Sequence, residues 1–367
     1  MILVLNCGSQ SIKWKLFDDK LKCQKEGKRE VFDSKNYQKT LEEELRSLVK
    51  YKNQIDKIGH RVVFGGEKYR KPTKINENVL QELQKLSGVA SLHNPYNLLG
   101  IKTAFTIFFK AEQIAVFDTE FYSNFLPKVF TYPLPKDISA KYKFKKFGFH
   151  GISHEYVAKE AAKKIKKSFN KEPYGESARG RQIKIITCHL GGGSSITAIK
   201  NGKAVDTSMG FSPMDGLVMM TRSGSIDPEI ILELSNDFGS EKAEEILNNH
   251  SGLRGICGAK NMLEVLNMIK NGDKKAEGHE PSRRAKLALD IFVYSIKKYI
   301  GSYFAILGGC DALVFTGAIG FGSAKIRNMV CKDLNILNPS ARLRAGTKIL
   351  AIETNEELAI AQKIINF

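Results

Sequence analysis

The chain has 367 residues, which is more than one typical domain needs and enough for two domains of moderate size. Hydrophobic residues make up 42% of it and charged residues 26%, so the composition is that of a globular protein and excludes extensive disorder. The net charge of +18 is compatible with an anionic substrate, an anionic membrane or nucleic acid. The lysines are spread along the chain without the arginine–aromatic interleaving of single-strand binders, which disfavours nucleic acid as a partner.

Nothing in the sequence indicates export or membrane insertion. No apolar run reaches the roughly 18 residues that span a membrane. The first residues, M-I-L-V-L-N, predict a strand rather than a signal peptide, and the six cysteines form no C-x-x-C pair. We therefore expect a cytoplasmic protein with no membrane partner.

The first half of the chain predicts alternating strands and helices. Residues 2–5 and 12–17 are apolar runs on either side of the turn-prone N-C-G-S, which is a β-hairpin signal. Apolar residues at helical spacing predict helices, and short apolar runs predict strands. The further elements expected here are helices at 37–50, 79–86 and 98–109 and strands at 58–64 and 114–117.

The second half begins the same pattern again. A strand at 183–190 ends in G-G-G-S-S, and the next two strands flank Asn201-Gly202, a strong hairpin turn. The other expected elements are strands at 195–200, 203–206 and 312–316, helices at 228–236, 242–248, 285–307 and 355–367, and surface loops at 166–181 and 271–282.

A unit of strand, glycine-containing turn and strand thus occurs twice, once near Asn6 and once near Gly191. Each copy is followed by further strands and helices, so the chain carries a weak internal repeat at about half its length. We therefore predict an α/β fold made of two related domains that face each other across a cleft.

Three glycine-containing turns follow apolar strands, at residues 6–11, 191–195 and 317–320. Such turns expose backbone N–H groups and allow close approach of a phosphate group. One turn alone is explained as well by a simple hairpin, but three together favour a phosphate site. A P-loop and a dinucleotide fold are disfavoured, because neither G-x-x-x-x-G-K-[ST] nor a helix-opening G-x-G-x-x-G occurs.

Charged residues at strand ends and turns are candidates for phosphoryl transfer, which needs cations around the phosphoryl oxygens and carboxylates for a metal ion. The candidates are Arg61, Asp118, His150, Arg222, Glu356 and Glu357. Structural roles are the alternative, such as a buried ion pair for Arg61 or favourable helix N-terminal charges for Glu356 and Glu357. Zinc and serine-hydrolase chemistry are disfavoured, since neither H-E-x-x-H nor G-x-S-x-G occurs.

Ordered segments over nearly the whole chain carry a family resemblance. They are N-C-G-S-Q-S-I-K, G-H-R-V-V-F-G-G-E, S-L-H-N-P, V-F-D-T-E-F, F-G-F-H-G-I-S-H, H-L-G-G-G-S-S-I, D-T-S-M-G-F-S-P-M-D-G-L, T-R-S-G-S-I-D-P, S-G-L-R-G-I-C-G, F-T-G-A-I-G and T-N-E-E. These segments resemble, in order, the signature segments of the acetate kinase (acetokinase) family, which belongs to the acetate and sugar kinase/actin superfamily. The D-T-S-M-G-F and T-R-S-G segments are highly specific.

The resemblance implies duplicated actin-like ATPase domains of the ribonuclease H-like kind. It places residues 1–147 and the C-terminal helix 356–367 in the first domain and residues 148–355 in the second, nucleotide-binding domain. The implied reaction is reversible, Mg²⁺-dependent phosphoryl transfer from ATP to acetate, giving acetyl phosphate and ADP. A homodimer is also implied, and a propionate kinase or a catalytically impaired nucleotide-binding relative are the alternatives.

The resemblance further implies a role for each matching residue. The catalytic residues would be Arg61, Asp118, His150 and Arg222, and the magnesium residues would be Asn6 and Glu356. The carboxylate substrate would meet Arg61, Val63, Leu92, His93, Phe149 and Pro213. The nucleotide phosphates would meet Ser9, Ser11, Lys13, His189, Gly191, Gly192, Gly193, Gly317, Ala318 and Gly320.

Several positions depart from the family pattern. Near the substrate side these are Gln10 for Ser, Phe64 for His, Glu120 for Ala and Tyr122 for His. On the nucleotide side Gly192 replaces Asn, the stretch Asn261, Met262, Leu263 and Glu264 replaces an S-x-D-x-R-like segment, and Phe321 and Gly322 replace Glu and Asn. Each lost polar contact costs roughly 1–3 kcal/mol, so we expect weaker or altered nucleotide recognition.

Overall fold

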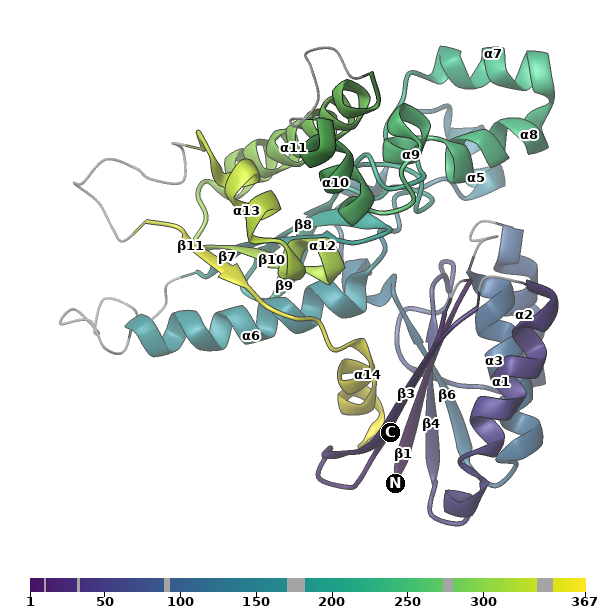
Figure 1. Cartoon of the computed structure of the whole chain (residues 1–367). Coiled ribbons are helices and arrows are strands. Elements are labelled where there is room, and N and C mark those ends of the chain that lie inside the picture. Colours follow the sequence, from purple (N-terminus) through teal and green to yellow (C-terminus); the bar gives the residue numbers. More distant parts are fainter. Residues whose placement is uncertain (10, 32–33, 89–92, 170–181, 273–279, 335–345) are drawn as a thin grey trace. The chain divides into compact units, whose positions relative to one another are not determined.

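The computed structural model describes residues 1–9, 11–31, 34–88, 93–169, 182–272, 280–334 and 346–367 (Figure 1). The chain divides into two compact units. Unit 1 comprises Met1–Ser123, Phe149–Tyr156 and Asn355–Phe367, and unit 2 comprises Asn124–Gly148 and Val157–Thr354.

This division differs from the predicted boundaries in two segments and at Asn355, which belongs to unit 1. Residues 124–147 pack in unit 2, where Lys146 pairs with Asp206 at 2.9 Å and the N–H of Phe147 donates to the carbonyl of Gly210. Residues 149–156 pack in unit 1, because the N–H of Gly151 donates to the carbonyl of Asp118 at 3.0 Å.

The described part of unit 1 is built on a six-stranded sheet of order β3-β2-β1-β4-β6-β5. Its strands are β1 (Ile2–Gly8), β2 (Ser11–Phe17), β3 (Cys23–Glu30), β4 (Lys57–Val62), β5 (Thr73–Lys74) and β6 (Glu112–Phe117). The first three form an antiparallel meander, whereas β4 and β6 run parallel to β1. The register places Leu5 beside His60 and Arg61 beside Val116, so the carboxyl ends of β1, β4 and β6 meet at one edge of the sheet.

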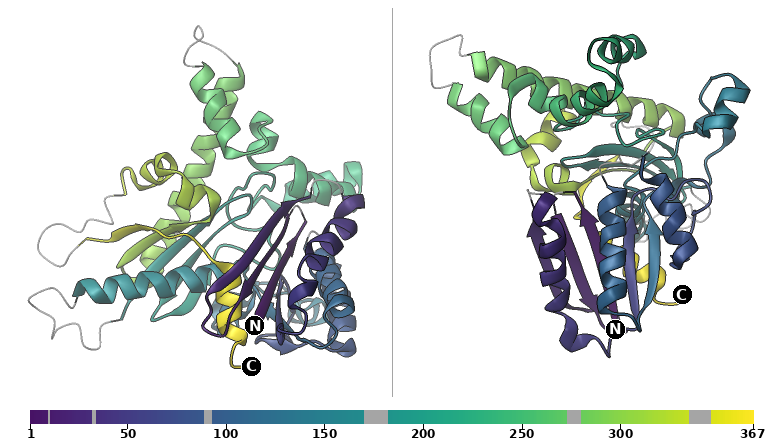
Figure 2. Two further views of the ribbon diagram at one scale, coloured as in Figure 1. Left: turned by 60° about the horizontal axis from the view of Figure 1, so that its bottom comes forward. Right: turned by 90° about the vertical axis from the view of Figure 1, so that its right-hand side faces the viewer.

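Helices cover both faces of this sheet, as the alternation along β1 requires. Leu3 and Leu5 pack in the core that α1 and α3 cover, and Ile2 and Val4 pack in the core that α14 covers. Figure 2 shows the yellow α14 on the opposite side of the purple strands from the purple α1 and the blue α3. The elements are α1 (Tyr37–Arg46), α2 (Glu77–Lys85), α3 (Asn94–Ile107), α14 (Glu356–Ile364), the start of α6 (Gly151–Phe169), and single 3₁₀ turns at Ser34–Asn36, Val49–Tyr51, Leu86–Gly88 and Glu120–Tyr122.

Unit 2 repeats the scheme of unit 1. The described part of its sheet has five strands in the order β11-β10-β7-β8-β9. They are β7 (Lys184–Leu190), β8 (Ser194–Lys200), β9 (Lys203–Thr207), β10 (Ala312–Thr316) and β11 (Lys348–Ala351). Strands β7, β8 and β9 form an antiparallel meander, and β10 and β11 run parallel to β7. The prediction of two related α/β domains is therefore confirmed.

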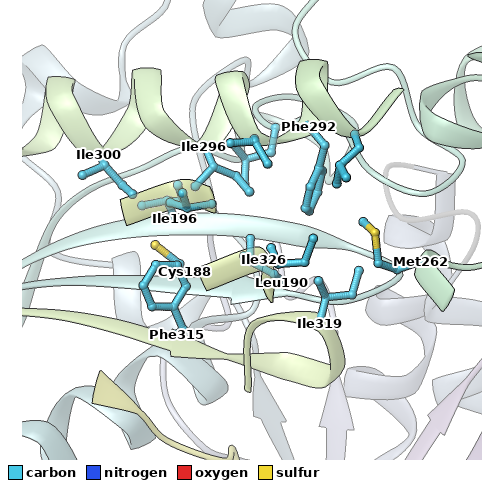
Figure 3. Packing of buried hydrophobic residues seen from close by; sticks show 14 of the residues in the cluster. Cys188, Leu190, Ile196, Met262, Phe292, Ile296, Ile300, Phe315, Ile319 and Ile326 are labelled. Carbon is cyan, nitrogen blue, oxygen red and sulfur yellow. The ribbon is translucent and has the colours of Figure 1, made fainter. Parts of the chain in front are cut away.

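The 28-residue helix α11 (Glu280–Leu307) covers one face of this second sheet. Figure 3 shows Phe292, Ile296 and Ile300 of this helix lying over Ile196 of β8, within the cluster that also contains Cys188. The other helices are α4 (Pro127–Phe130), α5 (Lys136–Tyr142), α7 (Pro228–Phe238), α8 (Ser240–Glu245), a π-helical turn (Ile246–His250), α9 (Gly252–Cys257), α10 (Met262–Gly272), α12 (Gly317–Gly322) and α13 (Ala324–Cys331).

Most predicted elements are present, with a few differences. The helix predicted at 37–50 ends at Arg46, and the helix predicted at 242–248 turns π-helical from Ile246 onward. Residues 166–169, predicted as part of a loop, continue helix α6, whereas the rest of that stretch lies outside the described residues. No described helix is both long and apolar enough to cross a membrane.

His60 in β4 makes the stability of the fold depend on pH. Its side chain is buried with Nε2 2.6 Å from Oε1 of Gln113, and burial lowers its pKa from 6.5 to about 4. Between these values the unfolded chain binds more protons, so stability is lost as the pH falls, by at most about 3 kcal/mol. Urea unfolding at pH 7.5 and pH 5 measures this loss.

A His60→Gln variant should lose less free energy of unfolding between these two pH values than the unsubstituted protein does. His250→Gln is the matched control, because His250 is exposed. An unchanged pH dependence in the His60 variant would contradict this assignment.

Candidate active site

Arg61 in unit 1 is bound by three side chains from distant parts of the chain. Its Nη2 lies 2.6 Å from Oδ2 of Asp118, and its Nε donates to both oxygens of the same carboxylate at 3.2 and 3.3 Å. Its Nη1 lies 3.1 Å from Oε2 of Glu356 and donates to Oδ1 of Asn6 at 3.2 Å. Charge-assisted bonds on two edges therefore fix the plane of the guanidinium group.

The sheet explains why these residues meet. Asn6 and Arg61 lie near the carboxyl ends of two neighbouring parallel strands, and Asp118 directly follows the third. Glu356 is the first residue of α14, which the side chain of Asn355 caps by accepting the N–H of Leu358 at 3.2 Å. The fold therefore brings together four residues that the sequence analysis singled out.

The cluster around Arg61 contains more carboxylates than cations. Burial would lower the pKa of Arg61, but Asp118 and Glu356 outweigh that effect and raise it. Burial raises the pKa of Asp118 above its ordinary value, and Arg61 opposes this shift. Nδ2 of Asn6 donates at 3.1 Å to Glu356 and at 3.1 Å to Glu357, which adds a third carboxylate. The excess of negative charge suits a hard cation with oxygen ligands.

The type of metal follows from the donors. Among the described residues, no group of three His, Cys, Asp or Glu side chains is arranged to hold a metal ion. Mg²⁺ commonly takes one or two carboxylates from the protein and keeps its other positions for water and phosphate oxygens. The oxygens of Asn6, Asp118 and Glu356 fit that pattern.

His150 is linked to this cluster through its backbone. It has a φ of 58°, which is rare for a residue with a side chain, and its N–H donates to the carboxylate of Asp118. The next residue, Gly151, lies so close to the carbonyl of Asp118 that a Cβ atom there would come within 2.1 Å of the oxygen. Asp118 therefore orients Arg61 and also holds the segment that carries His150.

The apolar candidates of unit 1 follow β4 and precede α6. Val63 and Phe64 are buried, and the ring of Phe64 lies 6.2 Å from that of Phe149. The half-buried His93 directly precedes α3, whereas Leu92 lies outside the described residues. Val63 and Phe149 thus lie in the same region of unit 1 as Arg61.

The hairpin between β1 and β2 carries three further candidates. Ser9, Ser11 and Lys13 are half-buried, and Lys13 lies opposite Asn6 in the β1–β2 register. Gln10, one of the departures from the family pattern, lies outside the described residues.

Arg222 is the candidate cation of unit 2. Its Nη1 donates to the carbonyl oxygen of Pro213 at 3.2 Å and lies 3.7 Å from Sδ of Met219. Burial lowers its pKa from 12.5 to about 10, so the group remains a cation at neutral pH. The fold thus joins two predicted site residues, Arg222 and the buried Pro213.

Two glycine-rich turns of unit 2 lie next to each other. Thr316 at the end of β10 pairs with His189 in β7, and a Cβ on Gly191 would lie 4.0 Å from the N of Ala318. The first turn is closed by a 3.0 Å hydrogen bond from the N–H of Gly191 to the carbonyl of Gly193, and Gly192 is exposed. Gly320 lies in the short helix α12, which begins at Gly317.

Gly317 is required by the backbone. Its φ is 77°, and a Cβ would come within 2.5 Å of the carbonyl oxygen of Leu190. A Gly317→Ala variant should therefore lose at least about 1 kcal/mol of stability and displace the turn. Gly322→Ala in the same helix is the control, because no described atom lies within 4 Å of its Cβ position.

Thermal unfolding and ATP binding of these two variants check the prediction. The Gly322 variant should match the unsubstituted protein in both measurements or be slightly more stable. Equal behaviour of the two variants would show that the turn tolerates a side chain.

The altered nucleotide-side stretch has a structural role. Oδ1 of Asn261 accepts the N–H of Glu264 at 3.0 Å, and Oε2 of Glu264 accepts the N–H of Lys260 at 2.7 Å, so the two residues cap α10. Met262 is buried in the core, where Figure 3 shows it, and Leu263 is exposed. A carboxylate at position 262 would therefore be buried, so Asn261→Asp is the variant that tests whether a carboxylate in this stretch strengthens nucleotide binding.

Two asparagines of α3 in unit 1, Asn94 and Asn97, hold the backbone at Val63 and Phe64 but have no site role predicted from the sequence. Oδ1 of Asn97 accepts the N–H of Val63 at 3.0 Å, and its Nδ2 donates to the carbonyl of Cys7. Asn94 in the same helix binds the backbone of Phe64 through both atoms of its amide. Their spacing of three residues puts both on one helix face, and this spacing is the sequence feature that could have indicated their shared role.

Comparisons with known proteins agree with the resemblance. The model of the Acetokinase family matches residues 20–362. Acetate kinase 2 of Clostridium perfringens is 36% identical over 411 residues, covering 100% of this chain and 98% of its own. The acetate kinase of Helicobacter acinonychis is 40% identical over 408 residues, covering 98% of this chain and 97% of its own.

Solved structures of similar sequence have the same fold. A propionate kinase from Francisella tularensis is 34% identical with a TM-score of 0.83, and covers 100% of this chain and 99% of its own. The acetate kinase of Porphyromonas gingivalis is 32% identical with a TM-score of 0.80, and covers 100% of this chain and 98% of its own.

Proposed function

The chain belongs to the acetokinase family and is an ATP:acetate phosphotransferase, and we propose that Arg61, His150 and Arg222 stabilise the phosphoryl group during its transfer. The observation that carries this proposal is the cluster around Arg61, in which the fold assembles residues that the family resemblance had singled out. The products are acetyl phosphate and ADP, and the reaction is reversible.

The chemistry needs little from the protein besides position and charge. A carboxylate oxygen of acetate attacks the γ-phosphorus, the bond from that phosphorus to the bridging oxygen breaks, and ADP leaves with the electron pair. A carboxyl group has an ordinary pKa of about 4, so the nucleophile is already ionised at neutral pH and needs no general base. Asp118 then acts by orienting the guanidinium of Arg61.

Cations around the phosphoryl oxygens supply the stabilisation. Arg61 is preorganised by Asp118 and Glu356, so little entropy is lost when it binds an anion. Arg222 in unit 2 is half-buried and still cationic at neutral pH, which strengthens its attraction for phosphoryl oxygens. His150, whose backbone N–H donates to the carboxylate of Asp118, would supply its imidazole as a further donor.

Asn6, Asp118 and Glu356 would hold Mg²⁺ together with the nucleotide phosphates. The donors are oxygen atoms, and the local charge is negative, which is what this ion requires. When bound, the ion neutralises charge on the phosphates of ATP.

Substrate and nucleotide contacts complete the proposal. Val63, Leu92, Phe149 and Pro213 would surround the methyl group of acetate, with His93 close by. The hairpin residues Ser9, Ser11 and Lys13 and the glycine turns at 191–193 and 317–320, with His189, would bind phosphates through N–H, hydroxyl and ammonium donors.

Propionate is the second candidate substrate, because one of the similar solved structures is a propionate kinase. Acetate and propionate differ by one methylene group, which an apolar pocket discriminates by about 1–3 kcal/mol. The ratio of kcat/KM for the two acids therefore measures how closely the pocket fits the methyl group.

A coupled assay of ADP release tests the function. Acetate, propionate and butyrate are compared with ATP and then GTP, each with and without Mg²⁺. Magnesium-dependent turnover that is fastest with acetate is expected. Folded protein that turns over none of the three acids would leave the catalytically impaired nucleotide-binding alternative.

A homodimer in the cytoplasm is part of the proposal and rests on the family resemblance. Sedimentation velocity at micromolar concentration measures the assembly, and a species of about 82 kDa, twice the chain mass of 41.0 kDa, is expected.

A further inference from the structure

A second charged cluster of unit 1 lies apart from the groups assigned to the reaction. Nζ of Lys363 is 2.9 Å from Oε1 of Glu120 and 2.8 Å from Oε2 of Glu155. The three side chains are only 16 to 18% exposed. Burial would lower the pKa of Lys363, but the two carboxylates outweigh it and raise the pKa, so the lysine remains charged.

Each member of this cluster stands on an element that also carries a group around Arg61. Glu120 follows Asp118 by two residues, in the 3₁₀ turn after β6. Glu155 lies one helical turn after Gly151, whose N–H donates to the carbonyl of Asp118. Lys363 follows Glu356 by seven residues in α14, which places the two on the same face of that helix.

Helix α14 therefore meets opposing electrostatic forces along this face. At its start, Glu356 lies close enough to Asp118 to raise the pKa of that carboxyl group, which means that the two carboxylates repel each other. Arg61 lies between them and attracts both. Two turns later, Lys363 attracts Glu120 and Glu155, which are fixed to the elements around Asp118.

We propose that Lys363 is a positioning residue, which holds α14 through Glu120 and Glu155 so that Glu356 and Asp118 share Arg61 in one arrangement. The inference deepens the proposed function and rests on it. Part-buried ion pairs add little net stability, because desolvation offsets their attraction, but they restrict which arrangement the packed elements adopt. Displacement of Glu356 by about 1 Å is enough to slow the reaction, since phosphoryl transfer depends on orientation.

The test compares Lys363→Met, Lys363→Arg and Glu120→Gln with the unsubstituted protein in the acetate and ATP assay. Lys74→Met is the matched control, because Lys74 also pairs with a carboxylate of unit 1, Glu112 at 2.7 Å, but is 68% exposed. We expect kcat of Lys363→Met to fall about tenfold with KM for ATP within about twofold, and Lys363→Arg to restore most of the loss. Glu120→Gln should show a smaller fall, and Lys74→Met none.

A purely structural ion pair would change the melting temperature and leave kcat per folded molecule unchanged. The proposal is overturned if folded Lys363→Met keeps its kcat, or if the arginine variant is no better than the methionine variant. If Lys363→Met does not fold, Glu120→Gln is the deciding variant, because its Lys363 still pairs with Glu155. An unchanged kcat of folded Glu120→Gln would then overturn the proposal. Inactivity of both the unsubstituted protein and Lys74→Met would instead show that the proposed function itself is wrong, and the positioning role with it.

Discussion

Replacing Arg222 by alanine is expected to lower kcat by about 10³-fold or more, with KM for acetate changed far less. The side chain contacts the carbonyl of Pro213 and the sulfur of Met219, so urea unfolding of the variant separates a loss of folded protein from a loss of kcat. What is lost is a half-buried cation for the phosphoryl oxygens. Arg222→Lys keeps the charge but loses the planar guanidinium group. Its kcat should therefore lie between those of the unsubstituted protein and Arg222→Ala.

The pH dependence supplies an independent check of this role. Because burial lowers the pKa of Arg222 to about 10, activity that needs the cation should fall as the pH rises through that value. Arg283→Ala is the matched control, since Arg283 is an exposed arginine of unit 2 that pairs with Glu280 one helical turn away at 2.8 Å. Turnover of Arg222→Ala within tenfold of the unsubstituted protein would show that this cation does not act on the phosphoryl group.

The strands of the fold were predicted where their side chains are apolar. In β1 every residue from Ile2 to Leu5 is buried, and the turn at Asn201-Gly202 has the positive φ angles that its sequence predicts. Strand β3 was missed because its sequence, C-Q-K-E-G-K-R-E, is almost entirely polar and exposed. It is held by backbone pairing with β2, and Gly27 gives the indole of Trp14 the room that a Cβ would take.

Helix α6 was missed for another reason. Its first residues belong to the F-G-F-H-G-I-S-H segment, whose glycines and histidines indicate a site turn more strongly than a helix start. The buried Val157, Ala158, Ala161 and Ile165 recur at helical spacing and would have predicted the helix. The many lysines between these apolar residues make the helical spacing difficult to recognise in the sequence.

The sequence predicted which residues form the site, but not which of their side chains contact each other. Asn6 and Glu356 are 350 positions apart and meet only because α14 returns to the sheet that β1 begins. The ion pairs of Lys363 depend on the same return of the chain, so no local pattern marks them. The family resemblance named the groups around Arg61, whereas the residues that hold those groups in place follow only from the packing.

Replacing Arg61 by methionine is expected to abolish measurable turnover and to lower the free energy of unfolding by about 3–5 kcal/mol. Methionine fills part of the volume of the side chain but leaves Asp118 and Glu356 without the cation that they share. Loss of one partner from a buried ion pair is costly, because the remaining charge stays desolvated and uncompensated.

The stability of this variant should respond to pH in a defined direction. Burial already raises the pKa of Asp118, and removal of the opposing Arg61 raises it further. A carboxyl group with a raised pKa binds more protons in the folded than in the unfolded state, so the stability lost by Arg61→Met should be partly regained as the pH falls from 7 to 5. The double variant Arg61→Met, Asp118→Asn removes one negative charge and should recover about half of the loss at pH 7 without recovering turnover.

Urea unfolding of the unsubstituted protein and both variants at pH 7 and pH 5 measures these differences. If Arg61→Met is as stable as the unsubstituted protein at both pH values, the carboxylates do not depend on Arg61 and the cluster is not preorganised by it. If the double variant is less stable than the single variant, Asp118 supports the fold through its bonds to the segment at His150 and Gly151 more than through Arg61.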